Sequence, residues 1–556
     1  MKKVFSLFIL CMVSLNGLTQ IVFENTSKTT IYEFLDEMAN QKFIEINSSI
    51  KPYSRKFIAE CLKEIEEKKE KLNKRQKGEL TFFLRDYSKE LGIENQWDWL
   101  GKRVIGKNRI KFKDRSKRVD LFYHKDSLLN ITVNPIGGTQ VWNNKNGTIM
   151  HRWNGAEMFA YLGKHIGIYG NLRDNYESRN VSGPVYLNQR SGGFFKGATV
   201  GFEDRNAKEY SELKGGITYG WKWGYVGLIK ESNVWGNNYN GSNILANRNP
   251  SFAQIRLNLK PAKWIEFNYF HGWLSSQVID SASTPNYVTG DSRVFVPKFL
   301  AMNMFTVKPL KSLHVSIGNS IVYSRNINAG YLVPFIFFKS LDHTYSTLGN
   351  SQLFFDVSIR SIRKLHFYFT GYIDELSVGR MLDKERHSNF WSGKVGARAS
   401  NVIPNTTFTA EYTRTNPMAF KHYNPETTYE STGYNLGNYL RDNAQDVFLQ
   451  IIYKPLPRLH FSAFYNYASK GPDYVDNRNQ KSPTTGKTYV LGLPFQESII
   501  WESTTMGGAV NYEVLNDIHL KLSAQYSNVW DPSGKYTPAA FSGKQITSSV
   551  TLCWGF

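Results

Sequence analysis

One tract of the sequence combines aromatic and amide side chains in the manner of a sugar-binding surface. Within SNVWGNNYNGSN, the rings are Trp235 and Tyr239. The amides of this tract are Asn233, Asn237, Asn238 and Asn240. Saccharides stack on flat aromatic faces and exchange hydrogen bonds with planar amides. We expect this tract to bind saccharide; the alternative is an ordinary connecting loop.

A second set of candidate ligand-binding residues consists of arginines near expected strand ends. They are Arg248, Arg325, Arg414 and Arg441. A guanidinium can pair with a uronate or phosphate through two parallel hydrogen bonds. The formal net charge of +21 also implies an anionic neighbour. We therefore expect an acidic polysaccharide as partner, and no nucleic acid, because the chain carries an export signal.

Four histidines occupy equivalent places just after turns: His314, His366, His460 and His519. Metal ligands must lie within a few ångströms of one ion. These histidines fall on separate strands around a wide ring, so we expect a polar rim that contacts the helical segment, and no metal site.

No catalytic motif stands out in the sequence. It lacks G-x-S-x-G, H-E-x-x-H, a Walker loop and any Cys/His cluster with metal spacing. We expect no catalytic residues, no cofactor and no enzyme activity, although a lipase-like Ser, His and Asn trio could be dispersed among strands.

The elements that must position these residues are hairpins. After residue 127, a unit of two alternating apolar runs around a tight turn repeats. The clearest turns centre on Pro261, Pro309, Arg363, Pro404, Pro455 and Asn516, and weaker ones fall at Gly163 to Lys164 and Trp221 to Lys222. Long connections, such as 231–249, 274–297, 415–443 and 469–502, separate the hairpins.

Short turns on one side and long loops on the other are typical of an outer-membrane β-barrel. Eight turns, a first strand near 128–136 and a last one at 545–556 predict an all-β transmembrane barrel of about 18 antiparallel strands. The segment GGFFKGATVGF, within 173–216, could add a strand. The final residue, Phe556, resembles the terminal aromatic by which barrels are recognised for insertion.

One strand shows how the two faces should divide. After Pro455, one set of alternate residues should face lipid and the other the lumen. The lipid set is Leu459, Phe461, Ala463, Tyr465 and Tyr467, and the lumen set is His460, Ser462, Phe464 and Asn466.

Residues 29–100 have a different pattern. Apolar residues recur at helical spacing from Ile31, from Ile58 and from Leu80, which predicts three amphipathic helices. Pro52 and Ser54 mark the start of the second, Asn73 separates it from the third, and Gly92 caps the end. We expect these helices to pack on one another or on a larger body, at the periplasmic mouth of the barrel.

The domain organisation follows from these patterns. Residues 1–19 read as a cleaved signal peptide, with Lys2 and Lys3 before an apolar run. Residues 20–100 form the periplasmic helical segment, 101–126 a basic linker and 127–556 the barrel. We interpret the lysine- and arginine-rich tract 101–118 as a solvated linker or, alternatively, a polyanion contact.

Composition agrees with a membrane barrel. Aromatic residues make up 15% of the chain and glycines number 43, as one lipid face and one wet face would require. Beyond the signal, no run approaches the ~20 apolar residues of a spanning helix. We expect a monomer in contact with outer-membrane lipid, located in the outer membrane of a Gram-negative cell.

The chain resembles the capsule assembly proteins of the Wzi type. The matching stretches are IYEFLDEMANQKFIEINSSIKPYSRKFIAECL, NGAEMFAYLGKHIGIYGNLRDN and GYLVPFIFFKSLDHTYSTLGNSQLFFDVSI. This resemblance implies a non-catalytic, lectin-like barrel that holds exported capsular polysaccharide on the cell surface. Two other functions stay open: a general porin or sugar-uptake channel, and an accessory barrel of a secretion system.

Overall fold

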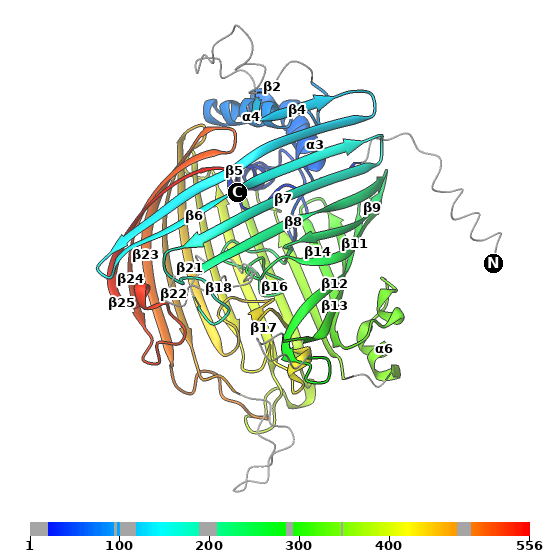
Figure 1. The fold of residues 1–556 in the computed structure, drawn as a ribbon, viewed down its shortest axis with the longest axis vertical. Coiled ribbons are helices and arrows are strands. Elements are labelled where there is room, and N and C mark those ends of the chain that lie inside the picture. The colour runs from blue at the N-terminus through cyan, green and yellow to red at the C-terminus, as the bar shows by residue number, and fades with distance from the viewer. Residues whose placement is uncertain are drawn as a thin grey trace, which may run out of the picture.

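The computed structural model describes residues 20–93, 97–99, 118–187, 208–284, 293–345, 348–474 and 491–555. The expected signal peptide, most of the basic tract and the segment GGFFKGATVGF lie outside these residues. The described part of the chain forms a tilted β-barrel with a group of helices at one end (Figure 1).

Eighteen long antiparallel strands of the described residues close the barrel, as the hairpin pattern predicts. In order around the wall they are β5 (Leu129–Asn144), β6 (Gly147–Leu162), β7 (Ile166–Glu177), β8 (Lys208–Trp221), β9 (Gly224–Glu231), β11 (Phe252–Ala262), β12 (Ile265–Ile279), β13 (Phe295–Leu310), β14 (Leu313–Ser324), β15 (Asn350–Ile359), β16 (Leu365–Glu375), β17 (Phe390–Ser400), β18 (Thr406–Thr415), β21 (Ala444–Leu456), β22 (Leu459–Lys470), β23 (Trp501–Leu515), β24 (Ile518–Trp530) and β25 (Gly543–Trp554).

All eight expected turns join neighbouring strands at one end of the barrel, which we call the turn end. The opposite, loop end carries the long connections. On β22 the side chains alternate as expected: Phe461 and Tyr465 are exposed on the outer face, and His460 and Asn466 are buried on the inner face. At β22 the wall therefore has an apolar outer face and a largely polar inner face, as is typical of a membrane barrel.

The barrel closes between β25 and β5, where Trp554 pairs with Gly137. Because β25 reaches only this far, the turn-end part of β5 would have an unpaired edge. A short strand, β4 (Phe122–Lys125), covers that edge by pairing with residues 130–133. Another, β3 (Arg118–Asp120), pairs with β2 (Trp97–Trp99). The end of the expected linker 101–126 is thus strand, because β5 needs backbone partners there.

Three α-helices occupy the turn end: α2 (Thr29–Asn40), α3 (Arg55–Glu66) and α4 (Lys74–Asp86). Ser54 caps α3 by accepting a hydrogen bond from the amide of Phe57, and Asn73 caps α4 in a capping box with Gln76. Helix α4 ends at Asp86; Gly92, with φ +69°, ends a following turn rather than the helix itself. Their apolar stripes form a core of their own, including Phe34, Leu62 and Phe83.

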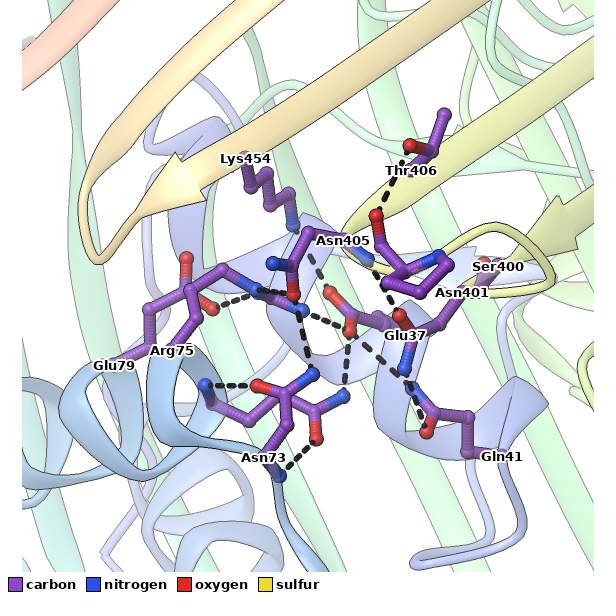
Figure 2. A network of polar contacts seen from close by, with 12 residues as sticks. Glu37, Gln41, Asn73, Arg75, Glu79, Ser400, Asn401, Asn405, Thr406 and Lys454 are labelled. Atoms are coloured by element: carbon purple, nitrogen blue, oxygen red, sulfur yellow. Dashed lines mark hydrogen bonds and ion pairs between the residues drawn. The ribbon is translucent and has the colours of Figure 1, made fainter.

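Buried ion pairs join this helical domain to the inner wall of the barrel (Figure 2). Glu37 of α2 pairs with Arg75 of α4 and lies 3.4 Å from Lys454 of β21. Burial opposes ionisation of Glu37, but Lys454 and Arg75 outweigh it and lower its pKa to about 2. Lys28 pairs at 2.7 Å with Asp517 in the β23–β24 turn. The domain is therefore held by charges that are shielded from water.

The four histidines contribute to this polar rim as expected. His460 lies 3.6 Å from Glu79 of α4, and His314 lies 3.6 Å from Glu45 in the α2–α3 connection. His366 contacts Arg360, which bonds Asn40 at the end of α2. His519 lies 3.9 Å from Glu513, the partner of Thr30. Among the described residues, no group of histidine, cysteine and acidic side chains could hold a metal ion.

Two long connections from the loop end fold inward. The segment 232–251 descends far enough for its β10 (Val234–Trp235) to pair with β1 (Ile50–Lys51) of the helical domain. The segment 416–443 packs against it: the hydroxyl of Tyr429 donates to the carbonyl of Ile244, 2.9 Å away, and the amide of Ala246 donates to Leu436. We call these two segments together the inner plug. It carries the small β19 (Glu430–Ser431) and β20 (Tyr434–Asn435).

The remaining helical elements are short. They comprise α6 (Phe338–Tyr345) on the outside of the barrel and the 3-10 turns η1 (Lys69–Lys71), η2 (Ala329–Leu332), η3 (Val378–Arg380), η4 (Pro425–Thr427) and η5 (Ala539–Phe541). No helix in the described ranges has both the length and the apolar character needed to cross a membrane.

Candidate functional site

A pocket opens inside the barrel on the side of β22, β23 and β24, toward the loop end. It encloses about 120 Å³ and combines aromatic rings with neutral polar side chains. The strands contribute Phe464, Asn466, Trp501, Ser503, Thr505, Gln525, Ser527 and Val529, and the loops contribute Leu187, Tyr439, Thr537 and Phe541. We call this space the lumenal pocket.

Strand register places the wall residues in rows. Asn466 is paired with Thr505, and Thr505 with Ser527, so three polar side chains lie side by side on the inner face. In the next row Gly507 separates Phe464 from Gln525. A Cβ on Gly507 would lie 2.6 Å from the Cβ of Gln525, too close for two carbons. Glycine at 507 therefore leaves the space between the ring and the amide open.

Hydrogen bonds to the surrounding structure fix the rings of the pocket. The indole N–H of Trp501 donates to the hydroxyl of Thr537 at 2.8 Å. The hydroxyl of Tyr439 donates to Asp446 at 3.2 Å. A preorganised ring loses little conformational freedom when a ligand stacks on it. This arrangement suits a saccharide, whose C–H face meets aromatic carbon and whose hydroxyls meet amides and hydroxyls.

The pocket's chemistry is that of binding. Among the described residues that line it, none carries a carboxylate or an imidazole. Glycoside hydrolysis would require a pair of carboxyl groups on either side of the scissile bond. The lining offers hydrogen bonds and stacking.

Trp235, an expected saccharide contact, is fully buried in the inner plug. Its ring packs edge-on against Phe270 and Phe354 of the barrel wall, with centroids 5.4 Å and 6.2 Å away. No face of this ring is open to a ligand. The Trp235 ring instead stabilises the plug, because apolar residues of the inner wall surround it.

Tyr239 lies farther along the same tract and is only half-buried. The guanidinium of Arg398 is 4.0 Å from the centre of the Tyr239 ring. The backbone amide of Tyr239 donates to Glu411 at 2.7 Å. The asparagines of the tract also bond to acidic wall residues: Asn237 contacts Asp356 and Asn240 contacts Asp446. These amides already bond to the barrel wall.

Arg248 contacts a residue that lines the lumenal pocket. Its guanidinium lies 4.5 Å from the ring centre of Tyr439, a pocket residue. Its Nη1 is buried and makes no hydrogen bond within the described part of the chain. Burial lowers the pKa of this arginine. An anionic group at the edge of the pocket would therefore meet a cation with unused hydrogen-bonding capacity.

The other three arginines do not line the pocket, and each has its own partners. Arg325 pairs with Glu426 at 2.7 Å, and Arg414 lies 3.9 Å from the ring centre of Phe495. Arg441 donates to the carbonyls of Gly433 and Pro184 and so joins two loops. All three stand at the loop end, as expected, but the structure does not bring them into one cluster.

Sequence reasoning missed the pocket as a unit, although one signal was available. Alternation on β22 places Phe464 and Asn466 toward the lumen, as the structure has them. Nothing local indicates that Trp501 and Gln525 face the same space, because they reach it through register across β23 and β24.

Comparison with known proteins gives one family. The model of the capsule assembly protein Wzi family matches residues 177–540. Among solved structures, Wzi from Escherichia coli, a carbohydrate-binding outer-membrane barrel involved in group 1 capsule assembly, is 11% identical and covers 97% of this chain and 100% of its own, with a TM-score of 0.53. At this identity the likeness shows the fold.

A weaker likeness is to OccD3 (OpdP) of Pseudomonas aeruginosa, at 11% identity over 77% of this chain and 91% of that one, with a TM-score of 0.42. That score is too low to support an argument about function. No curated protein matches the chain.

Proposed function

The chain belongs to the family of the capsule assembly protein Wzi, and from this premise we propose that it binds exported capsular polysaccharide and anchors it at the cell surface without turning it over. The chain is an outer-membrane β-barrel of this family. The turn end, with its helical domain, faces the periplasm, and the loop end faces outward.

The observation that carries this proposal is the lumenal pocket. Trp501, Phe464 and Tyr439 supply rings, and Asn466 and Gln525 supply amides, in the space between the wall of β22 to β24 and the edge of the inner plug, to which Tyr439 belongs. This combination of groups suits carbohydrate binding, which is described for Wzi of Escherichia coli. The pocket is near the loop end, so a chain held there extends toward the cell surface.

Charge supports an acidic polymer as the ligand. The net charge is +21, and Arg248 stands beside the pocket's Tyr439 with a buried, unused N–H. Individual exposed charge pairs contribute only ~0–1 kcal/mol. A long polymer that touches several such sites at once is retained much more strongly than any single site would allow.

The alternative of an open uptake channel fits the structure less well. The inner plug contributes an apolar core, with Trp235, Leu245 and Tyr429, inside the barrel. A channel would need this core to leave the lumen. We therefore favour a binding barrel whose plug is a permanent part of the fold.

The test compares neighbouring residues that face opposite sides of the wall. Phe464→Ala and Gln525→Ala remove a ring and an amide from the pocket, while Tyr465→Ala and Tyr526→Ala alter the outer face of the same strands. Purified barrels are mixed with the host's own surface polysaccharide, and the bound fraction is measured in a pull-down. We expect each pocket variant to weaken binding about tenfold, equivalent to 1.4 kcal/mol.

The outer-face variants should bind as the parent does. Equal binding by all four variants would place the ligand elsewhere and overturn the pocket as its site. Cleavage of the polymer by the parent protein would overturn the non-catalytic assignment.

A further inference from the structure

One segment that follows the loop end of a strand lies against the outer face of the barrel. Residues 325–345 leave the loop end of β14, pass through η2 and return as α6. Figure 1 shows α6 outside the strands, beside β12 and β13. We call this segment the outer arm.

The outer arm covers a patch of the outer wall. Beneath it lie outward-facing residues of β12, β13 and β14 that are almost completely buried, and they form one apolar cluster with Tyr331 and Phe338 of the arm. They are Phe267, Tyr269, Phe299, Ala301, Ile321 and Tyr323. Next to the patch the outer wall is open, and Ile317 of β14 is 63% exposed. The arm thus covers outer-wall residues at positions that are exposed elsewhere on the barrel.

Two asparagines on this outer face hold the arm in place. Asn303 stands near the middle of β13, and its Nδ2 donates to the carbonyls of Pro334 and Ile336, each 2.9 Å away. Asn319 of β14 accepts a hydrogen bond from the amide of Phe338 at 2.9 Å and donates to Asn303 at 2.7 Å. An amide facing hydrocarbon without partners would cost several kcal/mol. Here each amide bonds to the backbone of a specific segment.

The exposed surface of the arm divides into two parts. The part nearest the middle of the barrel, residues 332–337, presents large apolar side chains. Leu332, Val333, Phe335 and Phe337 are 41%, 45%, 56% and 45% exposed. The exposed side chains of α6 are largely polar: Lys339 and Ser340 follow the apolar part directly, and His343 and Thr344 lie closer to the loop end, beside Tyr345, which is 47% exposed. This gradient matches a membrane interface, with hydrocarbon toward the middle of the barrel and headgroups toward the loop end.

We propose that the outer arm is a lipid-binding element of the outer leaflet. Its apolar tip, centred on Phe335, contacts acyl chains, and His343 and Thr344 near the end of α6 lie toward the headgroups. The lipid-facing outer wall continues from Ile317 directly to this tip, which makes acyl chains the occupant. The inference rests on the outer-membrane location and is independent of polysaccharide binding.

The backbone of the arm can lie at this depth because its partners are inside the protein. Irregular backbone is tolerated in hydrocarbon only where its polar groups are satisfied by protein. The carbonyls of Pro334 and Ile336 bond to Asn303, and the carbonyl of Tyr331 accepts from the hydroxyl of Tyr269 at 2.9 Å. Asn303 and Asn319 are thus positioning residues for the tip.

Spin labels attached to single cysteines test the depth of the tip. Cys61 and Cys553 are buried, and both are replaced by alanine in the background used for labelling. Labels are placed at Phe335→Cys, at Val550→Cys on the outer face of β25, and at Leu382→Cys, which is 89% exposed in the β16–β17 loop. The full-length barrel is reconstituted into phosphatidylcholine vesicles, and collisions with oxygen and with a water-soluble nickel complex are measured.

We expect the label at position 335 to match the one at 550, with frequent oxygen collisions and few nickel collisions. A label at 335 that behaves like the one at 382 would place the tip in water and overturn the proposal. Protection from both reagents would mean that protein covers the tip, and would overturn it too.

A second variant addresses the anchors. Replacing Asn303 and Asn319 by leucine leaves the arm's carbonyls without partners, so the label at 335 should become more mobile, with at least a twofold rise in nickel collisions. Unchanged spectra would show that the asparagines do not position the arm. Polysaccharide pull-downs on the same variants keep this result separate from the proposed function, because the pocket lies inside the barrel at β22 to β24 and the arm lies outside at β12 to β14.

Discussion

The two sides of the barrel interior differ in a way that their outer faces do not reveal. On the side of β12 to β16 the inner face includes Phe270, Leu300, Met302, Phe354 and Tyr372, and the inner plug packs on these residues. On the side of β22 to β25, equivalent inner positions carry Asn466, Thr505, Gln525, Ser527 and Thr547, and a pocket remains. The plug covers the apolar residues of the first side, and the polar residues of the second side line the pocket, with Tyr439 of the plug at its edge.

The most apolar strand illustrates this difference. β13 reads FVPKFLAMNMFTV and lacks a clear alternation. Its inner residues Met302 and Met304 are covered by the plug, and its outer residues Phe299 and Ala301 by the outer arm. A strand buried on both faces has no reason to alternate. In contrast, β23 reads WESTTMGGAV, with small and polar residues toward the lumen.

The largest expected effect is on the plugged side. Trp235→Ala removes a fully buried ring from the plug core, which should destabilise its packing by about 3–5 kcal/mol. We expect the plug to loosen and single-channel conductance in planar bilayers to rise. Trp264→Ala, at a turn where the ring is 57% exposed, is the matched control and should leave conductance unchanged. An unchanged current in the Trp235 variant would show that the plug does not close the lumen.

The next effect concerns the buried charges that join the helical domain to the barrel wall at the turn end. Glu37→Gln leaves Arg75 and Lys454 without their shared carboxylate. Loss of one partner of a buried pair costs about 3–5 kcal/mol. The helical domain should become more sensitive to protease while the barrel stays intact on gels. Glu64→Gln, which removes an exposed pair with Lys68, should leave cleavage as it is. Equal resistance of both variants to the protease would argue against buried charges holding the helical domain to the barrel.

Acid should weaken the same junction without any mutation. Burial opposes ionisation, but Lys454 and Arg398 of the barrel wall and Arg75 of α4 lower the pKa of Glu37 to about 2 and also lower those of Glu33 and Glu79. A carboxylate with a lowered pKa stabilises the fold above its ordinary value, about 4.5, and this stabilisation is lost as pH falls toward 2. The protection factors of the α2 amides, which correct the exchange rates for the intrinsic effect of pH, should therefore fall between about pH 4.5 and 2. Constant protection over this window would contradict the sign.

The smallest effect separates arginines on the two sides. Arg325 is exposed at the loop end of the plugged side, where it pairs with Glu426, and Arg248 stands beside the pocket's Tyr439. Arg325→Ser should change polysaccharide binding less than twofold, since exposed charge pairs contribute ~0–1 kcal/mol. Arg248→Ser should weaken binding severalfold in the same pull-down, more so at low salt. Equal losses at both positions would mean that the polymer contacts the whole rim rather than the pocket side.

Much of the wall could be predicted from the sequence because its signals are local. The turns at Pro261, Pro309 and Pro455 lie within the hairpins they close, and alternation over a few residues assigns Phe464 inward and Tyr465 outward. Helix caps at Ser54 and Asn73 are equally local. The sequence by itself determined the fold class, the strand count and the helical domain.

Only the tertiary structure decided which long connection goes where. The tract around Trp235 is rich in asparagine, as an external loop would be, yet it lies inside, because Asp356, Glu411 and Asp446 accept its N–H groups from strands more than a hundred residues away. The segment with Phe335 and Phe337 lies outside, because Asn303 and Asn319 bond its backbone. Trp501 and Gln525 share a pocket through register alone. Such partners are distant in sequence, and no local periodicity encodes their meeting.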